Sequence, residues 1–134
     1  MINEAIDLIS LSKKPIVYIG GGLINSGNKA SAELIKFSKL TNFPITSTLM
    51  GLGAFPASDK LFLGMLGMHG TYEANMAMHD CDLMLNLGAR FDDRITGRLD
   101  SFSPKSKKVH VDIDPSSVNK NVEVDIAVIG DVAK

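Results

Sequence analysis

Near-continuous apolar runs alternate along the chain with helical patterns and glycine-rich turns. The runs of strand length, rich in Val, Ile and Leu, lie at residues 15–22, 43–49, 81–88, 107–114 and 124–131. Strands that lack polar alternation are typical of a parallel sheet whose two faces are both covered by helices. The sequence therefore predicts an α/β chain with a parallel sheet and helices on both faces.

Apolar residues at helical spacing predict three helices between these runs. The apolar stripes are Ile2, Ala5, Ile6 and Ile9; then Ala30, Leu34 and Phe37, widened by Ile35; then Ala74, Ala77, Met78 and Cys81. Asn3 and Thr71 are expected to cap the first and third helices, and Pro15 ends the first pattern. Residues 50–70 hold five glycines and one proline without a clear period, which predicts a long loop with at most a short helix. Further helices are expected to start at Asp114 and Asp131.

Composition excludes several classes of protein. At 134 residues the chain has the size of one domain, and 14 Lys+Arg against 15 Asp+Glu leave no basic stripe for nucleic acid. The sequence shows neither an apolar run long enough for a membrane helix nor an export signal. Cys81 is the single cysteine, so an intramolecular disulfide and a thiolate metal cluster are excluded, and a cytoplasmic location is expected. Because the sequence predicts that a helix begins at Asp131, just before Lys134, we expect the chain to be part of a longer protein.

Glycine, arginine and acidic residues collect where the predicted strands end. In an open parallel sheet, ligands bind beyond the carboxyl ends of the strands. Glycine lets a phosphate group approach the backbone, arginine offers a planar fork for phosphate, and an acid accepts from ribose hydroxyls. The strand-end residues are Gly20, Gly21, Gly22, Thr48, Leu49, Gly88, Ala89, Arg90, Asp112, Asp114, Gly130 and Asp131. Together they predict a nucleotide site.

Each of these features also has a purely structural interpretation. The three glycines could form a tight strand-to-helix turn, and the dinucleotide pattern G-x-G-x-x-G fails because Asn25 occupies its third glycine position. The second strand also ends without the acid that an NAD site places there. His69 could be a satisfied loop histidine, Met68 a core filler, and the charged stretch "LGARFDDRITGR" at 87–98 a solvated loop with salt bridges.

Two long stretches carry a family resemblance. "MLGMHGTYEANMAMHDCDLMLNLGARFDDRITGRL" (65–99) and "VHVDIDPSSVNKNVEVDIAVIGD" (109–131) resemble the central domain of the large, catalytic subunit of acetolactate synthase, a thiamine-diphosphate enzyme. "KKPIVYIGGGLINSG" and "FPITSTLMGLGAFP" match as well, so the resemblance covers nearly the whole chain. It implies a Rossmann-like sheet of about six strands, the DHS-like NAD/FAD-binding fold, as a single domain over residues 1–134 of a three-domain subunit.

The resemblance also implies that this domain holds FAD, as a structural requirement that carries no electrons in the main reaction. The implied contacts are Gly20, Gly21, Gly22, Thr48, Leu49, Leu66, Gly67, Met68, His69, Gly88, Ala89, Arg90, Asp92, Arg94, Ile95, Asp112, Ile113, Gly130 and Asp131. Arg98 lies beyond these contacts and is expected to be a surface charge.

In that family the parent enzyme decarboxylates pyruvate and joins the two-carbon unit to a second 2-oxo acid, in branched-chain amino-acid synthesis. Thiamine diphosphate and magnesium belong to flanking domains, so the resemblance gives these 134 residues no catalytic residue and no metal ligand. It further implies a homo-oligomer and a small regulatory subunit. Two alternatives stay open: the central domain of another thiamine-diphosphate enzyme, such as a pyruvate oxidase or a decarboxylase, and a structural middle domain that binds no nucleotide.

Overall fold

The computed structural model describes residues 2–25, 27–48, 51–56, 58–65, 71–89, 106–112 and 124–130. Within these ranges six strands form one sheet in the order β3-β2-β1-β4-β5-β6, and every neighbouring pair is parallel. The strands are β1 (Pro15–Ile19), β2 (Ile45–Ser47), β3 (Phe62–Met65), β4 (Leu83–Leu87), β5 (Lys107–Asp112) and β6 (Ile126–Ile129). This confirms the predicted Rossmann-like parallel sheet.

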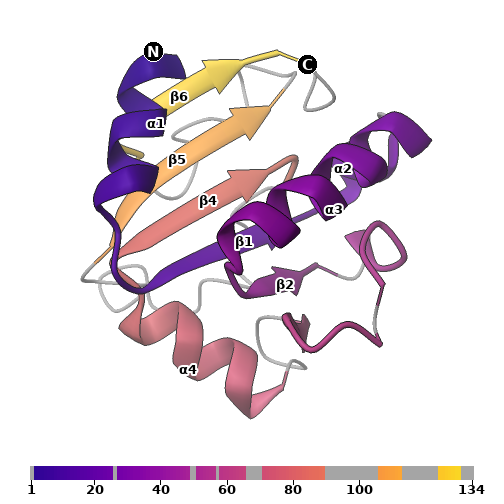
Figure 1. The fold of residues 1–134 in the computed structure, drawn as a ribbon. Coiled ribbons are helices and arrows are strands. Elements are labelled where there is room, and N and C mark those ends of the chain that lie inside the picture. The colour runs from indigo at the N-terminus through magenta and orange to yellow at the C-terminus, as the bar shows by residue number, and fades with distance from the viewer. Residues whose placement is uncertain are drawn as a thin grey trace.

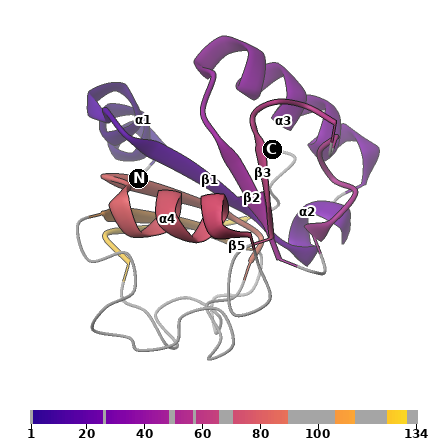
Figure 2. The same ribbon diagram turned by 90° about the horizontal axis from the view of Figure 1, so that it is seen from below.

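Helices cover both faces of the sheet, as predicted. The helices α1 (Ile2–Leu11), α2 (Gly21–Asn25) and α3 (Asn28–Thr41) lie on one face, and α4 (Tyr72–Asp80) lies on the other (Figures 1 and 2). None of the helices in the described ranges is long and apolar enough to cross a membrane. The molecule therefore has three layers, with the sheet between two helical layers.

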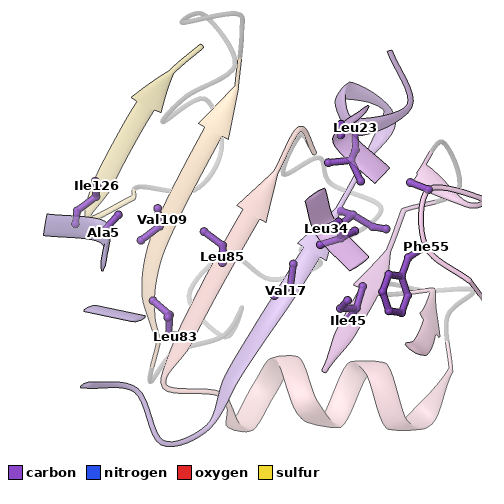
Figure 3. Packing of buried hydrophobic residues seen from close by; sticks show 13 residues of the cluster. Ala5, Val17, Leu23, Leu34, Ile45, Phe55, Leu83, Leu85, Val109 and Ile126 are labelled. Carbon is purple, nitrogen blue, oxygen red and sulfur yellow. The ribbon is translucent and has the colours of Figure 1, made fainter. Parts of the chain in front are cut away.

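Alternate residues of the central strands β1 and β4 contribute to two cores, one on each face of the sheet. Val17 and Ile19 of β1 pack with Leu34 of α3 in the larger core (Figure 3), whereas Ile16 and Tyr18 pack against the α4 face. Ala5, Leu23, Leu85, Val109 and Ile126 extend the larger core across the sheet, and Ala74 and Met84 join the smaller one. Complete burial of one such aliphatic side chain contributes about 1.5–3 kcal/mol, so both faces stabilise the sheet.

The structure corrects three local predictions. The expected loop at 50–70 contains β3, which adds the sixth strand at one edge of the sheet. The expected glycine turn after β1 contains the short helix α2, which begins at Gly21. Asn3 lies inside α1, which starts one residue earlier, so it is not the cap. The expected helix starts at Asp114 and Asp131 lie outside the described residues.

Candidate functional site

The strand order places a topological switch point between β1 and β4. From β1 the chain crosses toward β2, whereas β4 and β5 continue on the opposite side of β1. The loops that follow two such strands diverge, and the crevice between their carboxyl ends is the usual ligand site of an open parallel sheet. Gly20–Gly22 follow β1 at this point and Gly88–Ala89 follow β4.

The two loops touch each other directly at the base of this crevice. The N–H of Gly20 donates to the Leu87 carbonyl at 3.1 Å, and the N–H of Gly22 donates to the Gly88 carbonyl at 2.9 Å. A Cβ on Gly20 would lie 2.5 Å from the Ala89 Cα, and one on Gly22 would lie 2.8 Å from the Gly88 Cα. Backbone packing therefore requires glycine at both positions, and both N–H groups already have acceptors.

Asn86 shapes the turn that leaves β4. Its side chain is fully buried; Nδ2 donates to the Ala89 carbonyl and Oδ1 accepts from the Ala89 N–H, both at 2.9 Å. Gly88, inside this turn, has φ of +73°, a conformation that L side chains rarely adopt. Asn86 was not among the predicted site residues, although a single amide in the apolar strand "LMLNL" is a visible signal.

His110 and Asp112 form a buried pair at the carboxyl end of β5. His110 Nε2 lies 3.3 Å from Asp112 Oδ2, and the side chains are 0% and 12% exposed. Burial lowers the pKa of His110, while the charge of Asp112 and hydrogen bonding by Asp112 and the Ala89 backbone oppose that shift. The neutral imidazole is therefore favoured at neutral pH, and in the tautomer protonated at Nε2 it donates to the Asp112 carboxylate.

Two further strand ends complete the edge. The Thr48 hydroxyl accepts from the Gly51 N–H at 3.1 Å, and the Thr48 N–H donates to the Ile19 carbonyl. Gly130 donates to the Asp112 carbonyl at 2.9 Å, and a Cβ built on it meets nothing within 4 Å among the described residues. Among the described residues, the edge is therefore tightly packed after β1 and uncrowded at Gly130 after β6.

Comparison with known proteins identifies this arrangement. The family model described as "Thiamine pyrophosphate enzyme, central domain" matches residues 2–134. The chain belongs to this family. An acetolactate synthase large subunit of Haemophilus influenzae is 53% identical over 129 residues, which are 96% of this chain and 22% of that protein. The chloroplastic acetolactate synthase of Arabidopsis thaliana is 50% identical over 98% of this chain and 19% of its own length. The chain thus spans about a fifth of these relatives.

Eight of the nineteen predicted site residues are described, and all eight lie at one edge of the sheet. The described members, all at the carboxyl ends of strands β2, β1, β4, β5 and β6, are Gly20, Gly21, Gly22, Thr48, Gly88, Ala89, Asp112 and Gly130. The other predicted residues lie outside the described ranges: Leu49, Leu66, Gly67, Met68, His69, Arg90, Asp92, Arg94, Ile95, Ile113 and Asp131. Within the ranges that are described, no cluster of three or more His, Cys, Asp or Glu residues could hold a metal ion.

Two cavities of the central domain lie away from these residues. One, of about 450 Å³, is at the amino end of the sheet, lined by Lys13, Lys14, Asn42 and Cys81 among others. Another, of about 430 Å³, lies between α3 and β4 and is lined mainly by leucines and Phe37. No predicted site residue that the structure describes lines either cavity. The candidate site thus rests on topology and strand-end chemistry.

Proposed function

We propose that the chain is the FAD-binding central domain of an acetolactate synthase large subunit, one domain of a longer three-domain chain. The observation that carries the proposal is the identity of about 50%, over nearly the whole chain, with proteins that bear that name. The parent enzyme would decarboxylate pyruvate and join the two-carbon unit to pyruvate or 2-oxobutyrate. This would be the first common step of valine, leucine and isoleucine synthesis.

The described residues suit the sugar part of a flavin nucleotide. Asp112 presents a largely buried carboxylate at a strand end, and carboxylates accept hydrogen bonds from ribose hydroxyls. A Cβ on the neighbouring Gly130 would meet none of the described residues within 4 Å. The N–H groups of Gly20 and Gly22, by contrast, are engaged with β4 and its turn, so these two do not supply donors to phosphate. In the proposal that role belongs to Arg90 and Arg94, with Asp92 beside them, which lie outside the described residues.

The chemistry of the parent enzyme would come from other domains. Bound thiamine diphosphate would supply the carbanion chemistry and magnesium would hold its diphosphate, both on flanking domains. In the proposal the central domain binds and orients FAD and packs against its neighbouring domains. The isolated central domain would therefore be inactive. A homo-oligomer and a small regulatory subunit complete the proposed assembly.

One observation favours a second candidate, a structural middle domain without nucleotide. Gly20 and Gly22 are explained completely by backbone packing, without any ligand. Titration of the full-length protein with FAD, followed by quenching of flavin fluorescence, separates the two candidates. Saturable binding supports the FAD-binding domain, and its absence supports the structural one.

A separate assay tests the proposed parent enzyme. The full-length protein, supplied with thiamine diphosphate, magnesium and FAD, is expected to form acetolactate from pyruvate. Formation of acetaldehyde or acetyl phosphate in place of acetolactate would assign the chain to a decarboxylase or a pyruvate oxidase.

A further inference from the structure

Asn86 and His110 form a polar pair inside the sheet. The two residues are paired in the register of β4 with β5, and both are fully buried. His110 follows Val109, which belongs to the larger core, so its side chain projects from the opposite face, the face that α4 covers. Apolar residues at both positions would avoid the cost of burying polar groups. A polar pair here therefore calls for an explanation beyond sheet stability.

Each member of the pair is bonded to a residue farther toward the carboxyl edge. The Asn86 amide makes two hydrogen bonds to the backbone of Ala89, the residue directly before Arg90. The His110 ring contacts the carboxylate of Asp112 at 3.3 Å. Asn86 and His110 are register partners on adjacent strands, so the two halves lie side by side and form one polar network. The network thus connects the rigid centre of the sheet with two strand ends of the candidate site.

We infer that Asn86 and His110 are positioning residues for the flavin nucleotide. Asn86 fixes the turn from which the chain enters the arginine-containing segment, and His110 holds the Asp112 carboxylate in the orientation that accepts sugar hydroxyls. This inference rests on the proposed function, because both roles act on residues assigned to FAD.

Physical considerations support this division of roles. A carboxylate that is free to rotate loses conformational entropy on binding, whereas one already held by a neighbour does not. A neutral imidazole donates one hydrogen bond and leaves the negative charge of Asp112 able to accept from hydroxyl groups. The Asp112 side chain is 12% exposed and His110 is 0% exposed, so the carboxylate is the partly accessible member of the pair and the imidazole is its fully buried partner. This is the arrangement of a binding group with a buried supporting partner.

The test measures the dissociation constant of FAD by flavin fluorescence in the full-length protein, together with thermal unfolding. His110→Phe removes the donor and keeps a ring in place, and we expect it to weaken FAD binding roughly tenfold, or ~1.4 kcal/mol. His110→Gln can still donate from an amide and is expected to recover most of that loss. Val109→Ala, on the same strand and the opposite face, is the matched control. It should lower the unfolding temperature without changing the dissociation constant.

A double-mutant cycle distinguishes positioning from general stability. If His110 acts through Asp112, then His110→Phe should have no further effect on FAD affinity in an Asp112→Ala background. Asn86→Leu, which abolishes both bonds to Ala89, should weaken FAD binding through the other half of the network. Should His110→Phe fail to fold, His110→Met takes its place in the same cycle, because methionine adapts to irregular space.

The outcomes separate this inference from the proposed function. A wild-type protein without saturable FAD binding would refute the proposed function itself, and the inference with it. Normal FAD binding by the wild type together with unchanged affinity in His110→Phe would overturn the inference alone. Additive losses in the His110 and Asp112 cycle would overturn it as well, since they would show that the two residues act independently.

Discussion

Gly22 lies against Gly88 with no room for a side chain between them. A Cβ on Gly22 would be 2.8 Å from the Gly88 Cα, and a Cβ on Gly88 would be equally close to the Gly22 Cα. The contact joins the loop after β1 to the turn after β4 across the switch point of the sheet. Because both partners are backbone, neither can move aside as a flexible side chain would.

This contact predicts a stability loss in Gly22→Ala. Forcing a methyl group against backbone should cost about 1–3 kcal/mol of unfolding free energy, although alanine favours the α2 helix. Urea denaturation followed by circular dichroism measures the change. Gly130→Ala is the matched control, because its Cβ would meet none of the residues that the structure describes within 4 Å, and its stability should lie within about 0.5 kcal/mol of wild type. A Gly22→Ala protein as stable as wild type would show that the two loops separate easily.

A second prediction concerns Asp82, which ties the amino ends of β1 and β4 together. Its carboxylate accepts from the N–H of Lys13 at 2.7 Å and from the N–H of Lys14 at 3.0 Å. Asp82→Ala should lower the free energy of unfolding by about 1 kcal/mol. The effect is modest because water can accept hydrogen bonds from these exposed N–H groups once the carboxylate is removed. The comparison is Asp80→Ala. Asp80 is exposed at the last residue of α4, where a negative charge is unfavourable to the helix, so its removal should not destabilise the protein.

A third prediction follows from the lowered pKa of His110. In the unfolded chain this histidine titrates near its ordinary value of 6.5, whereas in the folded protein burial lowers its pKa. The unfolded state therefore takes up the proton first as the pH falls. The contribution to stability is complete above pH 6.5 and decreases as the pH falls from 6.5 toward the folded pKa.

Urea unfolding at about pH 7.5 and about pH 5.5 tests this dependence. The wild type should lose more stability between the two values than His110→Gln, which cannot titrate. Asp112, which faces the ring, and the exposed His79 on α4 are present in both proteins, so the difference isolates His110. An equal loss in both proteins would mean that His110 takes up a proton in the folded state as readily as in the unfolded chain.

The sequence was sufficient to predict those features that depend on residues close together in the chain. Thr71 was predicted to cap the third helix, and its hydroxyl does accept from the Ala74 N–H at 3.1 Å. β3 was missed because Gly64, at φ +98°, interrupts the strand pattern, and its residues are only partly buried at a sheet edge. Such a strand is recognisable mainly through its pairing with β2, which the sequence does not show.

The gathering of the described strand-end residues at one edge of the sheet was predictable from the sequence, whereas their contacts were not. Parallel strands end at the same edge, so strand ends far apart in sequence could be assigned to one place. The N–H groups of Gly20 and Gly22 donate to carbonyls of β4 and its turn. These hydrogen bonds depend on which strand lies beside β1, and that is a property of the tertiary structure. Asn86 and His110 were not predicted, because the role of a polar residue within a strand depends on partners that only folding brings together.

The last prediction returns to the arginines of the segment 87–98. Arg90→Ala should weaken FAD binding about tenfold or more, because a charge-assisted contact to phosphate is among the stronger hydrogen bonds of a protein, while the fold survives. Arg98→Ala removes the same charge a few residues later and should leave the dissociation constant unchanged. Measuring both at low and at high salt adds a second criterion: the difference between wild type and Arg90→Ala should shrink as salt screens the arginine. Equal effects of the two substitutions would assign the arginines to a solvated charged loop and leave Asp112 as the better supported contact.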